Sequence, residues 1–199
     1  MPDLRQQLQQ LLEGRVCLLG LGNVACGDDG FGVRLAEALI ASPSAPGIRA
    51  RVIVAGTTPE RVISRAAIRD CDHLILLDAV EFGGAPGSAV LLNSDEMVAR
   101  FPQVSTHKLS LGLLARQAES NGRTRAWLLG VQPQSLRPGE ELTPAVQTTL
   151  HLLFDLIQGC LEALPPGGRA SPRALTFLPP EPRLGSRGRS SSPNCEVRA

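Results

Sequence analysis

The sequence predicts an α/β protein, a single three-layer domain in which a mostly parallel, twisted sheet of about five strands carries helices on both faces. Short continuous apolar runs alternate with segments whose apolar residues recur at helical spacing. The chain has 199 residues, of which 43% are hydrophobic. That content suffices for one core of ordinary size.

The chain divides into three parts by composition. Residues 1–14 form an N-terminal helical extension, because Leu4, Leu8, Leu11 and Leu12 share one helical face. Residues 15–164 form the α/β domain. Residues 165–199 carry six Arg against two Glu, with seven Pro and five Ser. We expect this tail to be disordered, because it has too few apolar groups to offset chain entropy.

The first half of the domain has the pattern strand, glycine-rich loop, helix, strand, helix. The apolar runs 16–19 and 51–54 predict the strands. Helical spacing over residues 31–40 predicts a helix that ends before Pro43. Thr58-Pro59-Glu60 is typical of a helix start, with Thr as N-cap and Pro in the first turn.

The second half adds strands and helices of the same kinds. The run 73–80 is the most apolar strand, and Pro86-Gly87 turns the chain into an edge strand at 88–92. The remaining predicted elements are helices at 94–99 and 109–118, a strand at 124–131, and a helix that Thr143-Pro144 opens and that ends near Leu161.

Charge and cysteine content exclude some classes of function. A net charge of +1 gives no whole-chain electrostatic case for a nucleic-acid partner. The N-terminus has no apolar signal region, and the chain has no apolar run of membrane-spanning length. Five cysteines without a CxxC pair argue against a complete disulfide framework. We therefore expect a cytoplasmic protein.

The candidate site lies where predicted strands end. Asp28 and Asp29 follow the first strand and its glycine loop, Asp78 ends the third strand, and His107 precedes a helix. Ligands of open parallel sheets bind beyond the carboxyl ends of the strands. Asp29, Asp78 and His107 can therefore meet there, and two carboxylates with one imidazole suit a divalent transition ion such as nickel or zinc.

Each of these residues also has a structural interpretation. One of Asp28 and Asp29 is expected to be the N-cap of the helix that begins near Gly30. Asp78 alone is compatible with a hydrogen-bonded acid at a strand end, and His107 alone with a surface loop. Two further histidines, His73 at a strand start and His151 within the last helix, are expected to be structural.

The glycine loop also matches a second chemistry. Gly20-Leu21-Gly22-Asn23-Val24-Ala25 satisfies the dinucleotide-binding pattern after a strand. However, the second strand closes with Val54-Ala55-Gly56 and has no acid for a ribose. Two acids directly behind the loop would also repel a pyrophosphate. An oxidoreductase therefore ranks behind the metal-site interpretation.

Several motifs in order resemble the endopeptidases that mature the large subunit of nickel-iron hydrogenases. The resemblance covers residues 16–147. It rests on the glycine loop with Asp28-Asp29-Gly30 and on four further motifs, namely Gly56-Thr57-Thr58-Pro59-Glu60, Leu77-Asp78-Ala79, Ser105-Thr106-His107, and Gly130-Val131-Gln132-Pro133 with Leu142-Thr143-Pro144.

This resemblance implies a cytoplasmic α/β peptidase. Such an enzyme removes a C-terminal extension from the hydrogenase large-subunit precursor after nickel insertion. The family's metal-binding positions match Asp29, Asp78 and His107, and nickel is expected to arrive with the substrate as a recognition element. Asp29 or Asp78 as the catalytic base is a hypothesis. A metal-sensing chaperone that binds the same precursor without cutting it is the alternative.

This chain departs from the family's pattern at three places. Many relatives have an acid near the end of the second strand, where this chain has Val54-Ala55. Residues 1–14 and the tail after Leu164 have no counterpart in the resemblance. The prediction of an enzyme therefore depends on the central domain alone.

Overall fold

A computed structural model describes residues 3–42, 50–63, 70–101, 110–139 and 141–163. The predicted His107 and the tail lie outside these residues. The described elements are, in order, α1 (Leu4–Leu12), β1 (Val16–Leu21), the 3-10 helix η1 (Gly27–Gly30), α2 (Phe31–Ala41), β2 (Ala50–Gly56), α3 (Glu60–Ile63), β3 (His73–Ala79), β4 (Ala89–Asn93), α5 (Ser94–Arg100), α6 (Leu111–Glu119), β5 (Arg125–Val131) and α7 (Pro144–Glu162).

The five strands form one sheet in the order β2-β1-β3-β5-β4. All neighbouring pairs are parallel except β4 and β5, which are antiparallel. The predicted α/β class with a mostly parallel sheet is confirmed, and β4 is the edge strand expected after Pro86-Gly87. Because the chain leaves β1 toward β2 and returns on the other side as β3, the connections diverge between β1 and β3.

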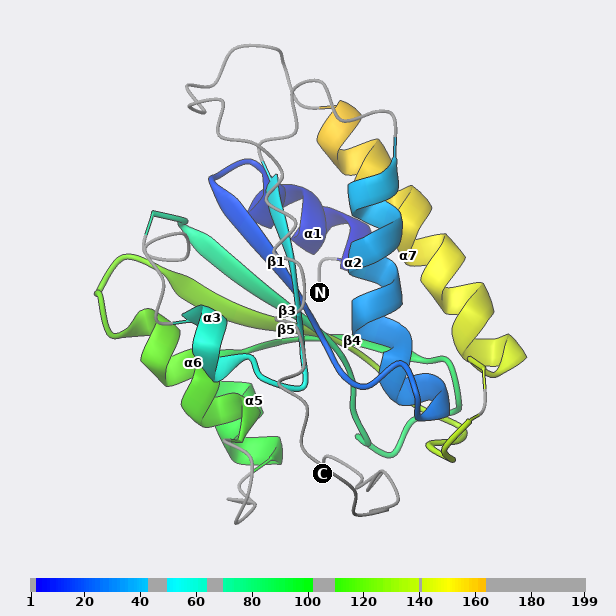
Figure 1. Cartoon of the computed structure of the whole chain (residues 1–199). Coiled ribbons are helices and arrows are strands. Elements are labelled where there is room, and N and C mark those ends of the chain that lie inside the picture. The colour runs from blue at the N-terminus through cyan, green and yellow to red at the C-terminus, as the bar shows by residue number, and fades with distance from the viewer. Residues whose placement is uncertain (1–2, 43–49, 64–69, 102–109, 140, 164–199) are drawn as a thin grey trace, which may run out of the picture.

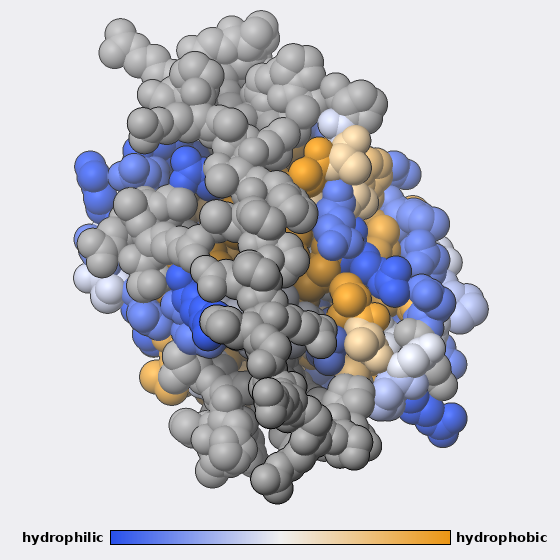
Figure 2. Space-filling model, in the orientation of Figure 1, coloured by the Kyte–Doolittle hydropathy of each residue, from blue (hydrophilic) through white to orange (hydrophobic). Residues whose placement is uncertain are grey.

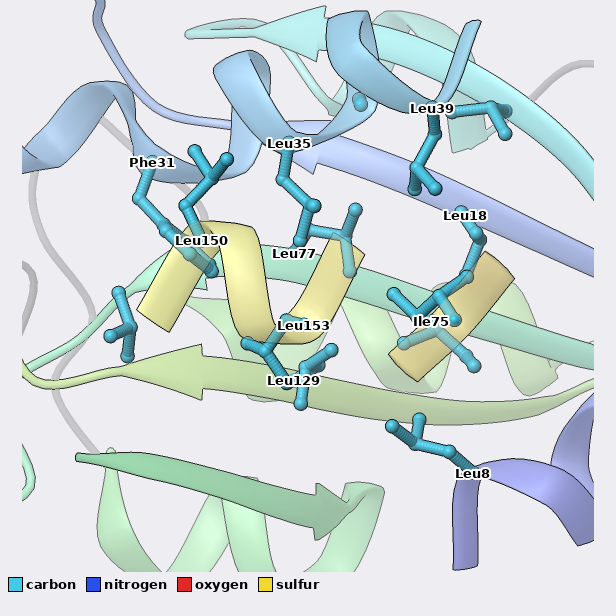
Figure 3. Close-up of a cluster of buried hydrophobic side chains, with 14 of the residues drawn as sticks. Leu8, Leu18, Phe31, Leu35, Leu39, Ile75, Leu77, Leu129, Leu150 and Leu153 are labelled. Carbon is cyan, nitrogen blue, oxygen red and sulfur yellow. The ribbon is translucent and has the colours of Figure 1, made fainter. Parts of the chain in front are cut away.

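Helices α1, α2 and α7 cover one face of the sheet, and α3, α5 and α6 cover the other (Figure 1). The first core lies under α2 and α7, where Phe31, Leu35 and Leu39 of α2 meet Leu150 and Leu153 of α7 above the sheet (Figure 3). Leu8, Leu11 and Leu12 of α1 are also buried in this core. The N-terminal helix is therefore packed against the domain.

The second core lies on the opposite face of the sheet. Leu74, Leu76 and Leu128 of the sheet pack there with Met97 of α5 and Leu114 of α6. Alternate residues of β3 belong to the two cores, because successive side chains of a strand point to opposite faces. Burial on both faces explains why this strand has a continuous apolar run rather than an alternating one.

Local sequence signals account for the helix starts on this side. Asn93 accepts a hydrogen bond from the Glu96 backbone N–H, and the Glu96 carboxylate accepts one from the Asn93 N–H, which is a capping box for α5. Ser110 caps α6. Within α6, Leu111 and Leu114 are buried, whereas Leu113 is 44% exposed.

A groove of about 590 Å³ runs between α2 and α7. Its walls include Ala38 and Ala41 of α2 with Leu150 and Phe154 of α7. The corresponding half of the surface in Figure 2 shows apolar residues between hydrophilic ones. The groove is lined by neither Asp29 nor Asp78, so it is separate from the candidate site.

No helix in the described part of the chain is both long enough and apolar enough to cross a membrane.

Candidate active site

The carboxyl ends of β1 and β3 approach the start of α2 very closely. A Cβ atom on Gly32 would lie 1.9 Å from the Leu77 carbonyl oxygen and 2.6 Å from that of Leu21. Only glycine allows the helix to begin directly against these two strand ends. The close packing places the loop between β1 and α2 at the switch point of the sheet, where ligand sites of this architecture form.

Gly22 brings Asp29 and Asp78 to the same point of the backbone. Its φ angle is +112°, and a Cβ there would lie 1.7 Å from the Asp29 carbonyl oxygen. The same position is 3.7 Å from Oδ1 of Asp78. The two acids, 49 positions apart in the sequence, therefore both lie close to Gly22, Asp29 through its backbone and Asp78 through its carboxylate.

Asp29 is bound by the backbone N–H of Asn23. Its Oδ2 accepts a hydrogen bond from the Asn23 backbone N–H at 2.8 Å, and its carbonyl oxygen accepts a second one from the same N–H at 3.2 Å. No other described residue donates to its carboxylate, and the residue is 9% exposed. Oδ1 therefore remains available for a ligand.

Asp78 is fully buried at the end of β3. Its Oδ1 accepts a hydrogen bond from the Ala79 backbone N–H at 3.1 Å. A buried carboxylate is costly unless it is paired with donors, a proton or a cation. Asp29, which is also buried, follows β1 at the same end of the sheet.

Asp28 has a structural role, and neither acid is the N-cap that the sequence predicts for one of them. Gly30 occupies the N-cap position of α2, without a side-chain hydrogen bond. The buried Asp28 carboxylate instead accepts four hydrogen bonds of 2.7–3.0 Å. The donors are the backbone N–H groups of Gln134, Ser135 and Thr143 and the Thr143 hydroxyl. Asp28 thereby fixes the loop between β5 and α7.

Thr143 and Gln132 are residues whose role sequence analysis missed. Thr143 has the N-cap position of α7, but its hydroxyl donates to Asp28 instead of capping the helix. Gln132 is buried, and its Oε1 accepts hydrogen bonds from the backbone N–H groups of Phe82 and Gly84. The motif Gly130 to Pro133 was the available signal, but it does not show which backbone groups Gln132 binds.

The other two histidines have hydrogen-bond partners away from Asp29 and Asp78. Nδ1 of His73 accepts a hydrogen bond from the Trp127 indole at 3.3 Å, at the opposite end of β3 from Asp78, and burial lowers the pKa of His73. His151 is exposed on α7 and hydrogen-bonds Gln147. The predicted third ligand, His107, is not among the described residues, and those residues contain no cluster of three metal-ligating side chains.

The loop amides that would bind a pyrophosphate have partners within the protein. The N–H groups of Gly22, Cys26, Asp28 and Asp29 donate to backbone carbonyl oxygens, and that of Ala25 donates to the Asn23 side chain. A dinucleotide site requires such groups to point at the ligand. The geometry therefore gives the oxidoreductase alternative no support.

The described thiols are not activated nucleophiles. The thiols of Cys17, Cys71 and Cys160 are buried. Burial raises the pKa of each thiol. A raised pKa disfavours the thiolate that a cysteine nucleophile requires.

Comparison with known proteins identifies the family. The model of the hydrogenase maturation protease family, HycI, matches residues 33–159, which is more than half of the chain. The chain belongs to the hydrogenase maturation protease family. The resemblance predicted from the motifs is thereby confirmed, and by family this protein is an endopeptidase.

Individual hydrogenase maturation proteases are similar over most of their length. The Hydrogenase 2 maturation protease of Escherichia coli strain K12 is 32% identical over 160 residues, which cover 76% of this chain and 96% of the relative. The crystal structure of the NiFe hydrogenase maturation protease HycI from Thermococcus kodakarensis KOD1 has a TM-score of 0.66 at 28% identity, covering 78% of this chain and 99% of that one. The solution structure of an endopeptidase HycI from Escherichia coli has a TM-score of 0.61 at 27% identity, covering 72% and 89%.

Proposed function

We propose that this endopeptidase removes the C-terminal extension of a nickel-iron hydrogenase large-subunit precursor after nickel has been inserted. Membership in the hydrogenase maturation protease family supports the class of substrate. The observation that carries the rest is that the Asp29 backbone and the Asp78 carboxylate both lie close to Gly22, at the ends of β1 and β3.

Nickel in this proposal belongs to the substrate and serves as a recognition element. Asp29 and Asp78, together with His107, bind the metal of the loaded precursor. Oxygen and nitrogen ligands of this kind suit divalent nickel. A nickel-free precursor offers no cation to the buried carboxylates, so the cleavage segment is not held at the site.

The hydrolytic step needs a base beside the scissile bond. We assign this role to the same pair of acids, and Asp29 is the better placed, because its Oδ1 receives no hydrogen bond from the described residues. The carboxylate takes a proton from water, the hydroxide oxygen bonds to the scissile carbonyl carbon, and the proton passes to the leaving amine as the peptide bond breaks.

The test is cleavage of purified precursor in its nickel-loaded and nickel-free forms, followed by mass spectrometry of the large subunit. The loaded form should lose its C-terminal extension and the nickel-free form should not. Asp29→Ala and Asp78→Ala should each slow cleavage at least about 100-fold, the scale of a lost acid-base group. Asp155→Asn, an exposed acid on α7, is the matched control.

The outcomes separate the alternatives. Equal cleavage of both precursor forms would remove nickel recognition from the proposal. Tight binding of the loaded precursor without any change in its mass would identify a metal-sensing chaperone instead. Binding of NAD(H) in a titration would be needed to revive the oxidoreductase alternative.

A further inference from the structure

The connection between β3 and β4 begins two residues after Asp78 and is fastened to the end of β5. The Val80 N–H donates to the Val131 carbonyl oxygen at 2.9 Å. The Gln132 N–H donates to the Ser88 carbonyl oxygen at 2.8 Å, and the Gly87 N–H donates to the Gln132 carbonyl oxygen at 2.9 Å. Both ends of the connection are thus hydrogen-bonded to the end of β5, and residues 81–85 lie between these two attachments.

Within residues 81–85, two backbone N–H groups are bound by the Gln132 side chain. Oε1 of Gln132 accepts hydrogen bonds from the Phe82 N–H at 2.9 Å and the Gly84 N–H at 3.1 Å, and Nε2 donates to the Pro133 carbonyl oxygen at 3.4 Å. Gln132 is buried, with 8% of the residue exposed. Without it, two backbone donors of this connection would lose their acceptor.

The register of β3 and β5 places Gln132 close to Asp78 of the candidate site. Asp78 pairs with Gly130 across β3 and β5, so Gln132 lies two residues beyond the partner of Asp78. Alternation puts Asp78 and Gln132 on the same face of the sheet, that of α5 and α6. Four residues of chain span at most about 14 Å, so Phe82 lies within that distance of Asp78.

One side of residues 81–84 is anchored and the other is open. The Phe82 side chain packs against the second core, beside the strands that carry Asp78 and Gln132. Glu81 and Gly83 are exposed, and no atom lies within 4 Å of a Cβ position on Gly83. The anchored segment is therefore exposed at Glu81 and Gly83, within a few residues of Asp78 along the chain.

We propose that Gln132 is a positioning residue that holds the segment Phe82–Gly84 as a surface on which the substrate polypeptide lies beside Asp78. This inference rests on the proposed function, because it concerns how the same precursor is bound. A fixed surface lowers the entropic cost of ordering a polypeptide on binding. Its loss should therefore weaken substrate binding more than the chemical step.

The test compares Gln132→Met, which removes the acceptor, with Gln132→Glu, which keeps it. Three quantities are measured: hydrogen exchange of the Phe82 and Gly84 amides, Kd for the nickel-loaded precursor, and KM and kcat of its cleavage. Gln132→Met should speed exchange at both amides and raise Kd and KM about tenfold or more, with kcat changed less than about threefold. Gln132→Glu should keep most of the wild-type protection of these two amides from exchange, and most of the affinity for the precursor.

Gln158→Met is the matched control, because Gln158 on α7 is also buried and its amide atoms have no hydrogen-bond partner among the described residues. It should leave exchange at Phe82 and Gly84, Kd and KM unchanged. Unchanged exchange at these amides in Gln132→Met, or faster exchange with unchanged Kd and KM, would overturn the proposal, as would a fall in kcat alone. Exchange and Kd do not require cleavage, so failure of the protease assignment is recognised separately.

Discussion

Two neighbouring acids at the end of the glycine loop have different tasks. Asp28 satisfies four donors from the β5–α7 loop, whereas Asp29 accepts from Asn23 at Oδ2 and its Oδ1 receives no hydrogen bond from the described residues. The sequence could place both acids at the site but could not assign these tasks. The donors to Asp28 lie 106–115 positions away, and no local pattern encodes such contacts.

Asp28→Asn should therefore destabilise the fold strongly. The amide can accept at one oxygen only, which leaves backbone donors of Gln134 and Ser135 or of Thr143 unsatisfied. Each buried donor without an acceptor costs about 1–3 kcal/mol. The less costly amide orientation leaves only the Thr143 N–H unsatisfied, so we expect a loss of about 1–3 kcal/mol in the free energy of unfolding. Urea denaturation measures this, with Asp155→Asn as control. A loss equal to that of the control would contradict the role of Asp28.

Asp72 gives a pH-dependent prediction at the other end of the sheet. Arg15 donates to the Asp72 carboxylate from its backbone N–H, Nε and Nη2, and these hydrogen bonds lower the Asp72 pKa from 3.8 to about 2. Because the unfolded chain takes up a proton at higher pH, this stabilisation is present above about pH 4 and is lost as the pH falls through about 2.

The measurement is the difference in unfolding free energy between wild type and Asp72→Asn across this range. The difference should be small, because both side chains are about half exposed, and it should vanish toward pH 2. If the difference in unfolding free energy stays constant with pH, the ion pair of Arg15 and Asp72 is not its cause.

At the scale of elements, periodicity and turn signals were sufficient for the described helices and strands. The apolar run of β3 and the helical spacing of α2 each follow from burial in the two cores. The rule that sites form at strand ends singled out Asp29 and Asp78 as candidates, and both residues lie close to Gly22. Hydrogen bonds between distant loops could not be predicted from the sequence. Examples are the bond from Thr143 to Asp28 and the bond from the Phe82 N–H to Gln132.

The contact between α2 and the strand ends should make Gly32 intolerant of substitution. In Gly32→Ala the new methyl group would meet the Leu77 carbonyl oxygen. We expect destabilisation of about 3 kcal/mol or more, at the upper end of overpacking effects. Gly159→Ala in α7, where no atom lies within 4 Å, should instead stabilise by up to about 1 kcal/mol. Thermal unfolding of both variants tests this, and equal effects would contradict the predicted contact.

At the scale of the whole molecule, the N-terminal extension contributes to the first core. Leu8 and Leu12 are at most 1% exposed, beneath α7. The sequence predicted the helix and its apolar face, but the partner of that face is α7, more than 130 positions away. A distant partner of this kind does not follow from periodicity.

Removal of residues 1–14 should therefore lower Tm substantially. Each buried leucine contributes about 1.5–3 kcal/mol by transfer from water, and the face of α7 would be exposed as well. Removal of residues 165–199, the tail expected from its composition to be disordered, should leave Tm nearly unchanged. Calorimetry of both truncations tests this division of the chain. The reverse order of effects would contradict it.

The most direct test of the account is nickel K-edge X-ray absorption of the nickel-loaded precursor, alone and in its complex with this protein. The account predicts added oxygen and nitrogen scattering in the wild-type complex, and loss of that change in Asp29→Ala and Asp78→Ala but not in Asp155→Asn. A nickel spectrum that is the same with and without the wild-type protein would contradict the claim that these carboxylates bind the metal.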